Sequence, residues 1–391
     1  MREVIIAAAA RTPIGSLGGS LAAVPAHRLG QTVIEAVLRR GGVGPDAVRE
    51  VIMGQILQAG CGQNPARQAA MGAGIPETVP AYTVNKLCGS GLKSVTLAAL
   101  AIAAGEADAI VAGGMESMSL SPYLLSKARA GYRLGNGVVE DSLIRDALTD
   151  AFHDIHMGVT AENIAERWRI SREEADAFAL QSQQKAGKAA REGRFAGELA
   201  PVAIPAKGGA VMITADEYPR GDTTMESLAR LRPVFRPDGV VTAGNASGIN
   251  DGAAALLLLE RSRAESLGVK PLARIRSWGT TALDPRIMGM GPVEAVRTAL
   301  AKGGLTLDDI DLVELNEAFA VQSLAVIREL RLDSRRVNVN GGAIALGHPV
   351  GASGARVLVT LVHEMERRGA RFGLAALCIG GGQGIAVVVE R

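Results

Sequence analysis

Three side chains stand out as possible reactive groups, and each lies in a glycine-rich segment. Cys88 lies within NKLCGSG at 85–91, His348 within LGHPVGA at 346–352, and Cys378 within LCIGGG at 377–382. A cysteine thiolate is a strong nucleophile, and an imidazole within reach can accept the proton of the thiol. Glycines beside such groups let a substrate approach the backbone closely. These types of residue predict nucleophilic catalysis through a cysteine.

Cys88 directly precedes a predicted helix that opens with Ser90 and Gly91. The N-terminus of a helix offers free N–H groups and the positive end of the helix dipole, and both lower the pKa of a thiol. We therefore expect Cys88 to favour the thiolate. The alternative is a buried structural cysteine, which composition alone favours.

His348 precedes a second helix, which opens with Ser353 and Gly354, as Cys88 precedes the first. Cys378 ends an apolar strand, and Asn316, in NEAF at 316–319, also follows a predicted strand. In a parallel sheet the ends of the strands and the starts of the helices share one edge, where ligands bind. We expect these groups to converge there.

The elements that position these groups occur twice along the chain. Segment 41–52 resembles 303–314, and 90–114 resembles 353–381 in the same order. In both pairs an amphipathic helix is followed by glycine and then by a short strand. The fully apolar strands suit a sheet covered on both faces. We expect two similar α/β halves that pack against each other.

A more polar insertion separates the two halves. It has helical patterns near 142–152 and 172–194, the second capped by Ser171 with Glu174 three residues later. An insertion of this size is a candidate substrate-binding subdomain. We predict a first half at 1–118 and 249–269, an inserted domain at 119–248, and a second half at 270–391.

Composition narrows the class of protein. The chain has 391 residues and a formal net charge of +2 from 42 basic and 40 acidic residues, so nothing marks it as a nucleic-acid-binding protein. Three cysteines are too few for a disulfide framework, and Cys61 has no motif around it. We find no signal peptide and no apolar stretch near the ~18 residues of a membrane span. We expect a cytoplasmic protein without a membrane partner.

Other signatures are incomplete. His363 and Glu364 begin like a zinc-protease motif, but Arg367 stands where the second histidine ligand belongs. No glycine cluster forms a G-x-x-x-x-G-K-[ST] phosphate loop, and no nicotinamide or flavin fingerprint is convincing. We expect neither a metal nor a cofactor.

LCGSG at 87–91, NEAF at 316–319, the glycine-rich run 338–354 and CIGGG at 378–382 resemble the successive signatures of the thiolase family, and the resemblance covers essentially the whole chain. His156-Met157 and Gly89 look most like the biosynthetic, acetoacetyl-CoA-forming type. The resemblance implies an α/β fold, a duplicated αβαβα five-layer core with an inserted loop domain, in a homotetramer. It implies condensation of two acetyl-CoA to acetoacetyl-CoA and CoA, and the reverse thiolysis; the alternative is a broader 3-ketoacyl-CoA thiolase of fatty-acid degradation.

The resemblance also implies roles for individual residues. Cys88 would become acylated, His348 would take its proton, and Cys378 would deprotonate the second acetyl-CoA. One oxyanion would be bound by His348 and a water held by Asn316, the other by the backbone N–H groups of Cys88 and Gly380. Coenzyme A is then substrate and product, and its expected contacts are Leu148, His156, Met157, Arg220, Phe235, Ala243, Ser247, Ala318 and Phe319. Arg220 would meet a nucleotide phosphate; a solvated surface arginine is the alternative.

Two rival functions use the same scaffold. Decarboxylating condensing enzymes that work with an acyl carrier protein generally pair the cysteine with two histidines, or with histidine and asparagine, whereas this chain has Cys378. A non-catalytic acyl-CoA-binding protein would not need both cysteines, His348 and Asn316 together. By the same resemblance, the polar insertion at 121–137 would make the contacts between dimers in the tetramer.

Overall fold

A computed structural model describes residues 2–391, and a ten-stranded sheet forms its core. Along the sheet the strands follow the order β14-β15-β16-β13-β1-β12-β5-β3-β4, and the short β2 pairs with β12. The strands of this sheet are β1 (Val4–Arg11), β2 (Gly15–Ser16), β3 (Glu50–Gly54), β4 (Ala81–Val84), β5 (Ala109–Ser117), β12 (Asn250–Glu260), β13 (Ala273–Ala282), β14 (Leu312–Leu315), β15 (Phe372–Ile379) and β16 (Gln383–Glu390).

The two halves of the sheet repeat one pattern. In the first half β1 and β12 are antiparallel, β12 and β5 are antiparallel, and β5 and β3 are parallel. In the second half β13, β16, β15 and β14 have the same order and the same strand directions. A short pairing of Ile5 and Ile6 with Arg274 and Ala273 joins the halves. The predicted duplication is confirmed.

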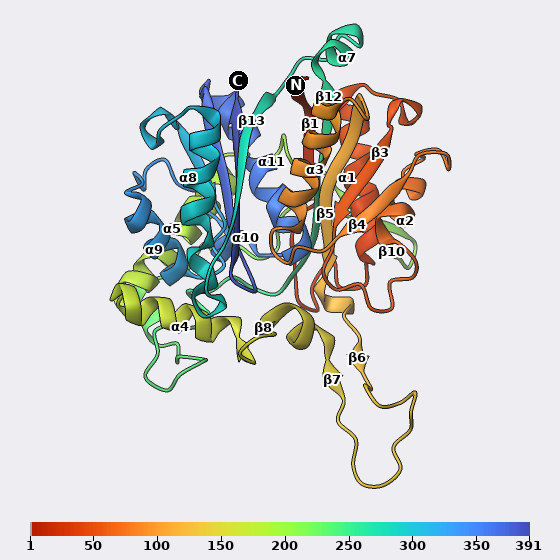
Figure 1. The fold of residues 1–391 in the computed structure, drawn as a ribbon. Helices are drawn as coiled ribbons and strands as arrows, with labels where there is room; N and C mark the ends of the chain where they lie inside the picture. Colours follow the sequence, from red (N-terminus) through yellow and green to blue (C-terminus); the bar gives the residue numbers. More distant parts are fainter. Residues whose placement is uncertain (1) are drawn as a thin grey trace.

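Helices cover the sheet in three layers (Figure 1). Helices α3 and α11 pack against each other in the middle and contact strands of both halves. Helices α1 and α2 cover the first half, and α8, with α9 packed against it, covers the second. The five-layer αβαβα core is therefore confirmed. The helices are α1 (Ala26–Gly41), α2 (Pro65–Gly72), α3 (Ser90–Ala104), α7 (Arg261–Ser266), α8 (Gly291–Gly303), α9 (Ala320–Leu330), α10 (Ala343–Leu346) and α11 (Val350–Arg368).

The central helices touch backbone to backbone through a repeated glycine. A Cβ on Gly91 would lie 2.7 Å from the amide nitrogen of Ala355, and one on Gly354 would lie 2.3 Å from that of Leu92. Only glycine leaves room for so close a crossing. The contact brings the N-terminal ends of α3 and α11 together, and these are the ends that carry Cys88 and His348.

The expectation that no apolar stretch reaches membrane length was wrong. The window Leu87–Ala104, which contains α3, has a mean hydropathy of 1.6 over 18 residues, enough by length and composition to cross a membrane. In this fold 56% of that window is buried inside the protein. A helix covered by sheet on both sides needs apolar residues all round, so the same composition fits a central core helix.

The insertion crosses the end of the core where β5 leaves it and returns through β12 (Figure 1). Its helix α5 begins with the predicted capping box between Ser171 and Glu174. The helix expected at 142–152 is one π-helical turn over Leu143–Leu148, followed by the β8–β9 hairpin, so that prediction was too long. The elements of the insertion are β6 (Tyr123–Leu124), β7 (Glu140–Asp141), β8 (Thr149–Asp150), β9 (Ile155–His156), α4 (Met157–Trp168), α5 (Arg172–Arg191), β10 (Val202–Ala206), β11 (Gly209–Ile213) and α6 (Met225–Ala229).

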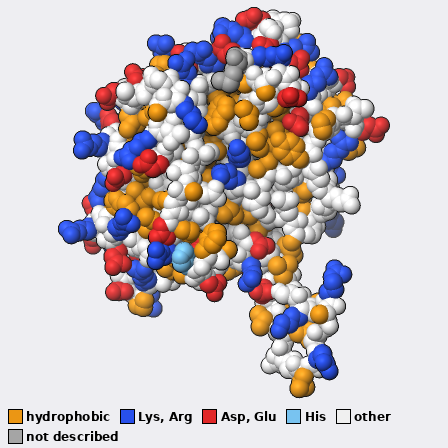
Figure 2. Space-filling model, in the orientation of Figure 1, with side chains coloured by type: hydrophobic (Ala, Val, Ile, Leu, Met, Phe, Trp, Pro, Cys, Tyr) orange, Lys and Arg blue, Asp and Glu red, His pale blue; other side chains and the backbone are white. Residues whose placement is uncertain are grey.

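The β6–β7 hairpin, residues 121–142, projects away from the body of the molecule (Figure 1). Figure 2 shows apolar and basic side chains together on this projection. Leu134 is 99% exposed, Val138 73% and Tyr123 68%. We call this projection the hairpin arm.

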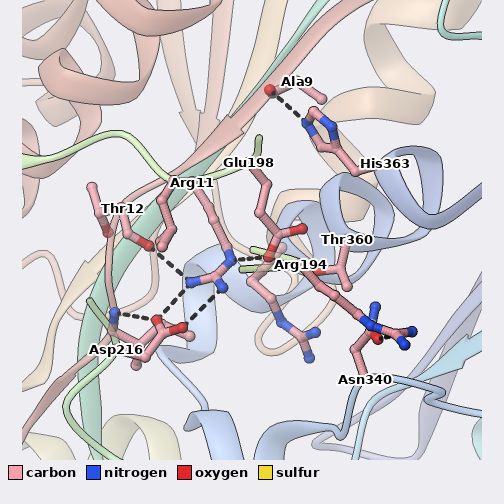
Figure 3. A network of polar contacts seen from close by, with 12 residues as sticks. Ala9, Arg11, Thr12, Arg194, Glu198, Asp216, Asn340, Thr360 and His363 are labelled. Carbon is pink, nitrogen blue, oxygen red and sulfur yellow. Dashed lines mark hydrogen bonds and ion pairs between the residues drawn. The ribbon is translucent and has the colours of Figure 1, made fainter. Parts of the chain in front are cut away.

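Buried ion pairs fasten the insertion to the core (Figure 3). The guanidinium of Arg11 at the end of β1 donates to Glu198 at 2.6 Å and to Asp216 at 2.6 and 2.9 Å. Thr360 of α11 contacts the same Glu198 at 3.3 Å, and His363 lies 3.2 Å from the carbonyl of Ala9. His363, the residue that began like a zinc motif, thus links α11 to β1.

Candidate active site

A cavity of about 320 Å³ opens where the insertion meets the starts of α3 and α11. Cys88 and His348 both lie in its wall, and no Lys, Arg, Asp or Glu side chain lines it. Its other lining residues are Met118, Ile144, Ala147, Leu148, His156, Met157, Val234, Phe235, Thr242, Ala243, Ala246, Ser247, Gly248, Ile249, Met288, Ala318, Phe319 and Val350. Such a cavity suits a slender, uncharged group with a few polar atoms.

Cys88 stands on a tight turn between β4 and α3. Leu87, the residue before it, has a left-handed φ of 47°, which is uncommon for a residue with a side chain. The backbone N–H groups of Gly380 and of Cys88 itself are directed at the sulfur and lower its pKa, but burial outweighs them and raises that pKa to about 11. The predicted effect of the local N–H groups, which favour the thiolate, is therefore opposed by a larger loss of hydration.

His348 lies between α10 and α11 and is held by two hydrogen bonds. Its backbone N–H donates to Asn250 Oδ1 at 2.8 Å, and its Nδ1 lies 2.6 Å from the hydroxyl of Ser353. Its Nε2 is buried and has no partner among the described residues 2–391. Burial, and after it the charge of Arg356, lowers the pKa of His348 to about 3, so the ring is neutral near pH 7.

Cys378 lies one residue before the end of β15 and is fully buried. Burial raises the pKa of its thiol, and the neighbouring Cys88 raises it further. The strand end is pressed against the Cys88 turn, since a Cβ on Gly89 would lie 2.4 Å from Ile379 Cδ1. The two cysteines are thus neighbours, although Cys378 stands behind the wall of the cavity.

Asn316 follows β14 directly and is fully buried. Its backbone N–H donates to the carbonyl of Ala376 at 3.0 Å, which holds it beside β15. Neither its amide nitrogen nor its amide oxygen has a partner within residues 2–391. Buried amides are almost always hydrogen-bonded, so this side chain is available to a water or a substrate.

The predicted coenzyme A contacts gather in the cavity, with one exception. Leu148, His156, Met157, Phe235, Ala243, Ser247, Ala318 and Phe319 all line it. The rings of His156 and Phe235 stack with their centroids 4.7 Å apart. Arg220 does not line the cavity; it is exposed, with its guanidinium 5.7 Å from the ring centroid of Tyr218. Tyr218 packs on Gly248, which does line the cavity, so Arg220 stands outside that wall.

Sequence reasoning missed residues that hold the site without touching the cavity. The buried carboxylate of Glu116 accepts the N–H groups of Ile56 at 3.0 Å, Leu57 at 3.2 Å and Gly351 at 2.9 Å. It thereby ties β5, the loop after β3 and the first turn of α11 together. Asn250, the first residue of β12, holds the backbone N–H of His348. Both are polar residues at strand ends, which was the available signal.

No group of three or more His, Cys, Asp or Glu side chains that could hold a metal ion occurs in the part of the chain that the structure describes.

Comparisons with known proteins agree with this architecture. The model of the thiolase N-terminal domain matches residues 4–262, and that of the thiolase C-terminal domain matches 269–391. The chain is 59% identical to an acetyl-CoA acetyltransferase of Chromobacterium violaceum and 57% identical to one of Escherichia coli K12, with 100% of each chain covered. A probable acetyl-CoA acyltransferase of Staphylococcus epidermidis is 54% identical, over 100% of this chain and 99% of its own.

A solved structure extends the comparison to three dimensions. The crystal structure of the Bacillus anthracis acetyl-CoA acetyltransferase superimposes with a TM-score of 0.98 at 47% identity and covers 100% of this chain and 99% of its own. Two family models that together span the length of the sequence, and relatives this similar, leave one assignment: the chain belongs to the thiolase family.

Proposed function

We propose that the protein is an acetyl-CoA C-acetyltransferase, which condenses two acetyl-CoA to acetoacetyl-CoA and CoA and catalyses the reverse thiolysis. The observation that carries the proposal is that Cys88 and His348 share the wall of one uncharged cavity, with Cys378 buried next to Cys88. The names of the relatives, acetyl-CoA acetyltransferases over the full length, support the same activity.

In the first half-reaction Cys88 attacks the thioester carbonyl of acetyl-CoA. The proton of its thiol passes to Nε2 of His348, the acetyl group moves to the sulfur, and CoA leaves with the proton. The high pKa of Cys88 means that the thiolate forms only as the proton is transferred. The N–H groups of Cys88 and Gly380, which converge on this sulfur, are suited to bind the oxyanion of the tetrahedral intermediate.

In the second half-reaction a new acetyl-CoA binds to the acetylated enzyme. We assign Cys378 as the base that removes its α-proton: the thiol of Cys378 first gives its own proton to Nε2 of His348, and the thiolate then takes the α-proton. The resulting carbanion attacks the acetyl-enzyme, and the thiolate of Cys88 that leaves as acetoacetyl-CoA forms takes the proton back from Nε2. The enolate oxygen needs its own donors. Nε2 of His348 in its protonated form and a water on the free amide of Asn316 are the donors that we assign to it.

The cavity fits the arm of coenzyme A better than its nucleotide. A pantetheine arm is slender and uncharged and carries amide groups, whereas the nucleotide carries phosphates that no lining side chain would neutralise. We therefore place the arm between the insertion and Phe319 and the nucleotide outside. Arg220, beyond the wall that Gly248 forms, is the proposed partner for a phosphate.

The test is thiolysis of 3-ketoacyl-CoA substrates of increasing chain length. The reaction is started with free CoA and measured as the loss of the enolate absorbance of the substrate. We expect acetoacetyl-CoA to give the highest kcat/KM, with a steep fall for longer chains. Equal rates up to long chains would establish the broader 3-ketoacyl-CoA thiolase instead. No thiolysis of any substrate, with intact binding of CoA, would establish a non-catalytic acyl-CoA-binding protein.

We further propose a homotetramer, a dimer of dimers, in which the hairpin arm makes the contacts between dimers. The exposed Tyr123, Leu134 and Val138 on the arm support this proposal. Location in the cytoplasm, and catalysis without a metal or cofactor, stay predictions from the sequence.

A further inference from the structure

Ser353 lies in the first turn of α11 with only 1% of its surface exposed. Its Oγ is 2.6 Å from Nδ1 of His348 and 2.9 Å from the carbonyl oxygen of Pro349. A serine hydroxyl has one proton to donate, and a carbonyl oxygen can only accept. If the proton goes to Pro349, the oxygen of Ser353 is left to accept a proton from Nδ1 of His348.

The first half of the core contains a comparable serine, whose bonds can have only one direction. Ser90 is the counterpart of Ser353 at the start of α3, and its hydroxyl donates to the carbonyl of Leu87 at 2.6 Å. Its oxygen accepts the backbone N–H of Lys86 at 2.8 Å, and a backbone N–H can only donate. In this half the direction of both bonds is unambiguous. Ser353 in the second half likewise bonds one backbone carbonyl, here that of Pro349, and has the imidazole of His348 where Ser90 has a backbone donor.

We propose that Ser353 is a positioning residue, which keeps the proton of His348 on Nδ1 and so leaves Nε2 as the acceptor for the proton of Cys88. This inference rests on the proposed function for its consequence, although the position of the proton can be measured without any substrate. The opposite tautomer would present an N–H where the base must have a lone pair.

The proton balance follows directly from this arrangement. When Cys88 reacts, its S–H bond breaks, the electron pair stays on sulfur, and a new N–H bond forms at Nε2 of His348. The ring is then an imidazolium with two N–H groups, and the one at Nδ1 remains bonded to Ser353. When CoA leaves, the proton on Nε2 passes to its sulfur, and the starting tautomer returns.

The surroundings of His348 make the choice of tautomer decisive. Because burial keeps the ring neutral, only one nitrogen carries a proton in the resting enzyme. The backbone cannot shift to compensate, since Asn250 holds the N–H of His348 and Gly347 has a φ of +104°. A Cβ on Gly347 would lie 2.6 Å from Cγ of Asn250, so this glycine fixes the close approach.

The direct test is nitrogen-15 NMR of the histidine rings in the wild-type enzyme without substrate. The chain has 5 histidines, and the signals of His348 are identified by their loss in His348→Gln. We expect a protonated Nδ1 and an unprotonated Nε2. The reverse assignment would overturn the proposal whatever the enzyme catalyses, whereas an inactive enzyme with this tautomer would overturn only the proposed function.

Kinetics of Ser353→Ala supply the second test. We expect kcat to fall about tenfold or more, but less than the ~10²–10⁴-fold that a general base contributes, with KM for acetyl-CoA little changed. Ser353→Thr keeps the hydroxyl and should restore much of the rate. The matched control is Ser94→Ala, which removes another buried helical hydroxyl, one whose Oγ lies 2.7 Å from the carbonyl oxygen of Gly91 and 2.6 Å from that of Gly113. Equal losses of kcat in Ser353→Ala and Ser94→Ala, or no rescue by threonine in a folded variant, would reduce Ser353 to a structural role.

Discussion

Two cysteines of the same chemical type have different surroundings, and we expect different roles for them. Cys88 opens onto the cavity with two N–H groups directed at its sulfur, while Cys378 is fully enclosed behind it. Cys378→Ser should therefore keep the exchange of label between acetyl-CoA and free CoA, because that exchange needs only the first half-reaction. Condensation should fall by ~10²–10⁴-fold or more, because a serine hydroxyl is a poor acid and base near neutral pH.

The matched variant is Cys88→Ser, which should lose exchange and condensation together. Mass spectrometry of the wild-type enzyme after incubation with acetyl-CoA should find the acetyl group on Cys88. A label on Cys378 or Cys61, or equal loss of exchange and condensation in Cys378→Ser, would contradict this division of roles.

The pKa values at the site predict an unusual pH dependence of alkylation. The pKa of Cys88 is raised to about 11 by burial, so its thiolate fraction should increase about tenfold per pH unit between pH 7 and 10. Iodoacetamide reacts with the thiolate, so the alkylation rate of Cys88 in the free enzyme should rise across this whole range. Peptide mass spectrometry separates Cys88 from Cys61. An alkylation rate that stops rising below pH 8 would show that the N–H groups lower the pKa of Cys88 more than burial raises it.

At the scale of elements, the sequence predicted most of the fold. The helices and strands of both halves follow apolar spacings that depend only on neighbouring residues, and the capping box of α5 is local as well. The segment predicted as a helix at 142–152 has a helical spacing of apolar residues, but its helical turn ends at Leu148. Thr149 and Asp150 pair with His156 and Ile155 in a hairpin instead, which that spacing does not reveal.

The site was less predictable than the fold, for a physical reason. Cys88 and His348 could be paired because the duplication places both before equivalent helices. The raised pKa of Cys88, the free amide of Asn316 and the bond between Ser353 and His348 depend on burial and on contacts between distant segments. Arg220 illustrates the limit: it is exposed outside the cavity, so its predicted contact with a nucleotide phosphate stays a prediction.

The crossing of α3 and α11 gives a prediction for an element pair. A Cβ on Gly354 would lie 2.3 Å from a backbone nitrogen that cannot move without its helix. Gly354→Ala should therefore push the two helix starts apart, lower the free energy of unfolding by about 3 kcal/mol and reduce kcat. Gly44→Ala is the control, because nothing lies within 4 Å of its added methyl group. Denaturant unfolding and kcat of both variants test this; equal behaviour would disprove the close packing.

Glu116 gives a second prediction at this scale. Its carboxylate accepts N–H groups from the loop after β3 and from α11. In Glu116→Gln one oxygen becomes an NH₂ group that faces at least one of these donors. Leaving buried N–H groups unpaired costs about 1–3 kcal/mol, so the free energy of unfolding should fall by that amount. Denaturant unfolding measures it, and an unchanged midpoint and slope would show that these bonds contribute nothing.

At the scale of the whole molecule, the hairpin arm has apolar side chains that the monomer leaves exposed. Leu134 is 99% and Val138 73% exposed, on an arm that only its base holds to the body (Figures 1 and 2). Exposed apolar groups at this density mark contact surfaces between proteins. We expect the wild-type protein to be a homotetramer by light scattering, and the double variant Leu134→Glu, Val138→Glu to be a dimer, because burying unpaired carboxylates at the contact is costly.

The control for this prediction is Leu267→Glu, which adds one carboxylate on a residue that is 38% exposed and directly follows α7, and α7 lies at the opposite end of the molecule from the arm (Figure 1). It should leave the tetramer intact. The cavity lies within one subunit, so the dimeric double variant should also retain thiolysis of acetoacetyl-CoA, which separates loss of assembly from loss of folding. A wild-type protein that stays dimeric on concentration, or a double variant that stays tetrameric, would show that the arm does not join the dimers.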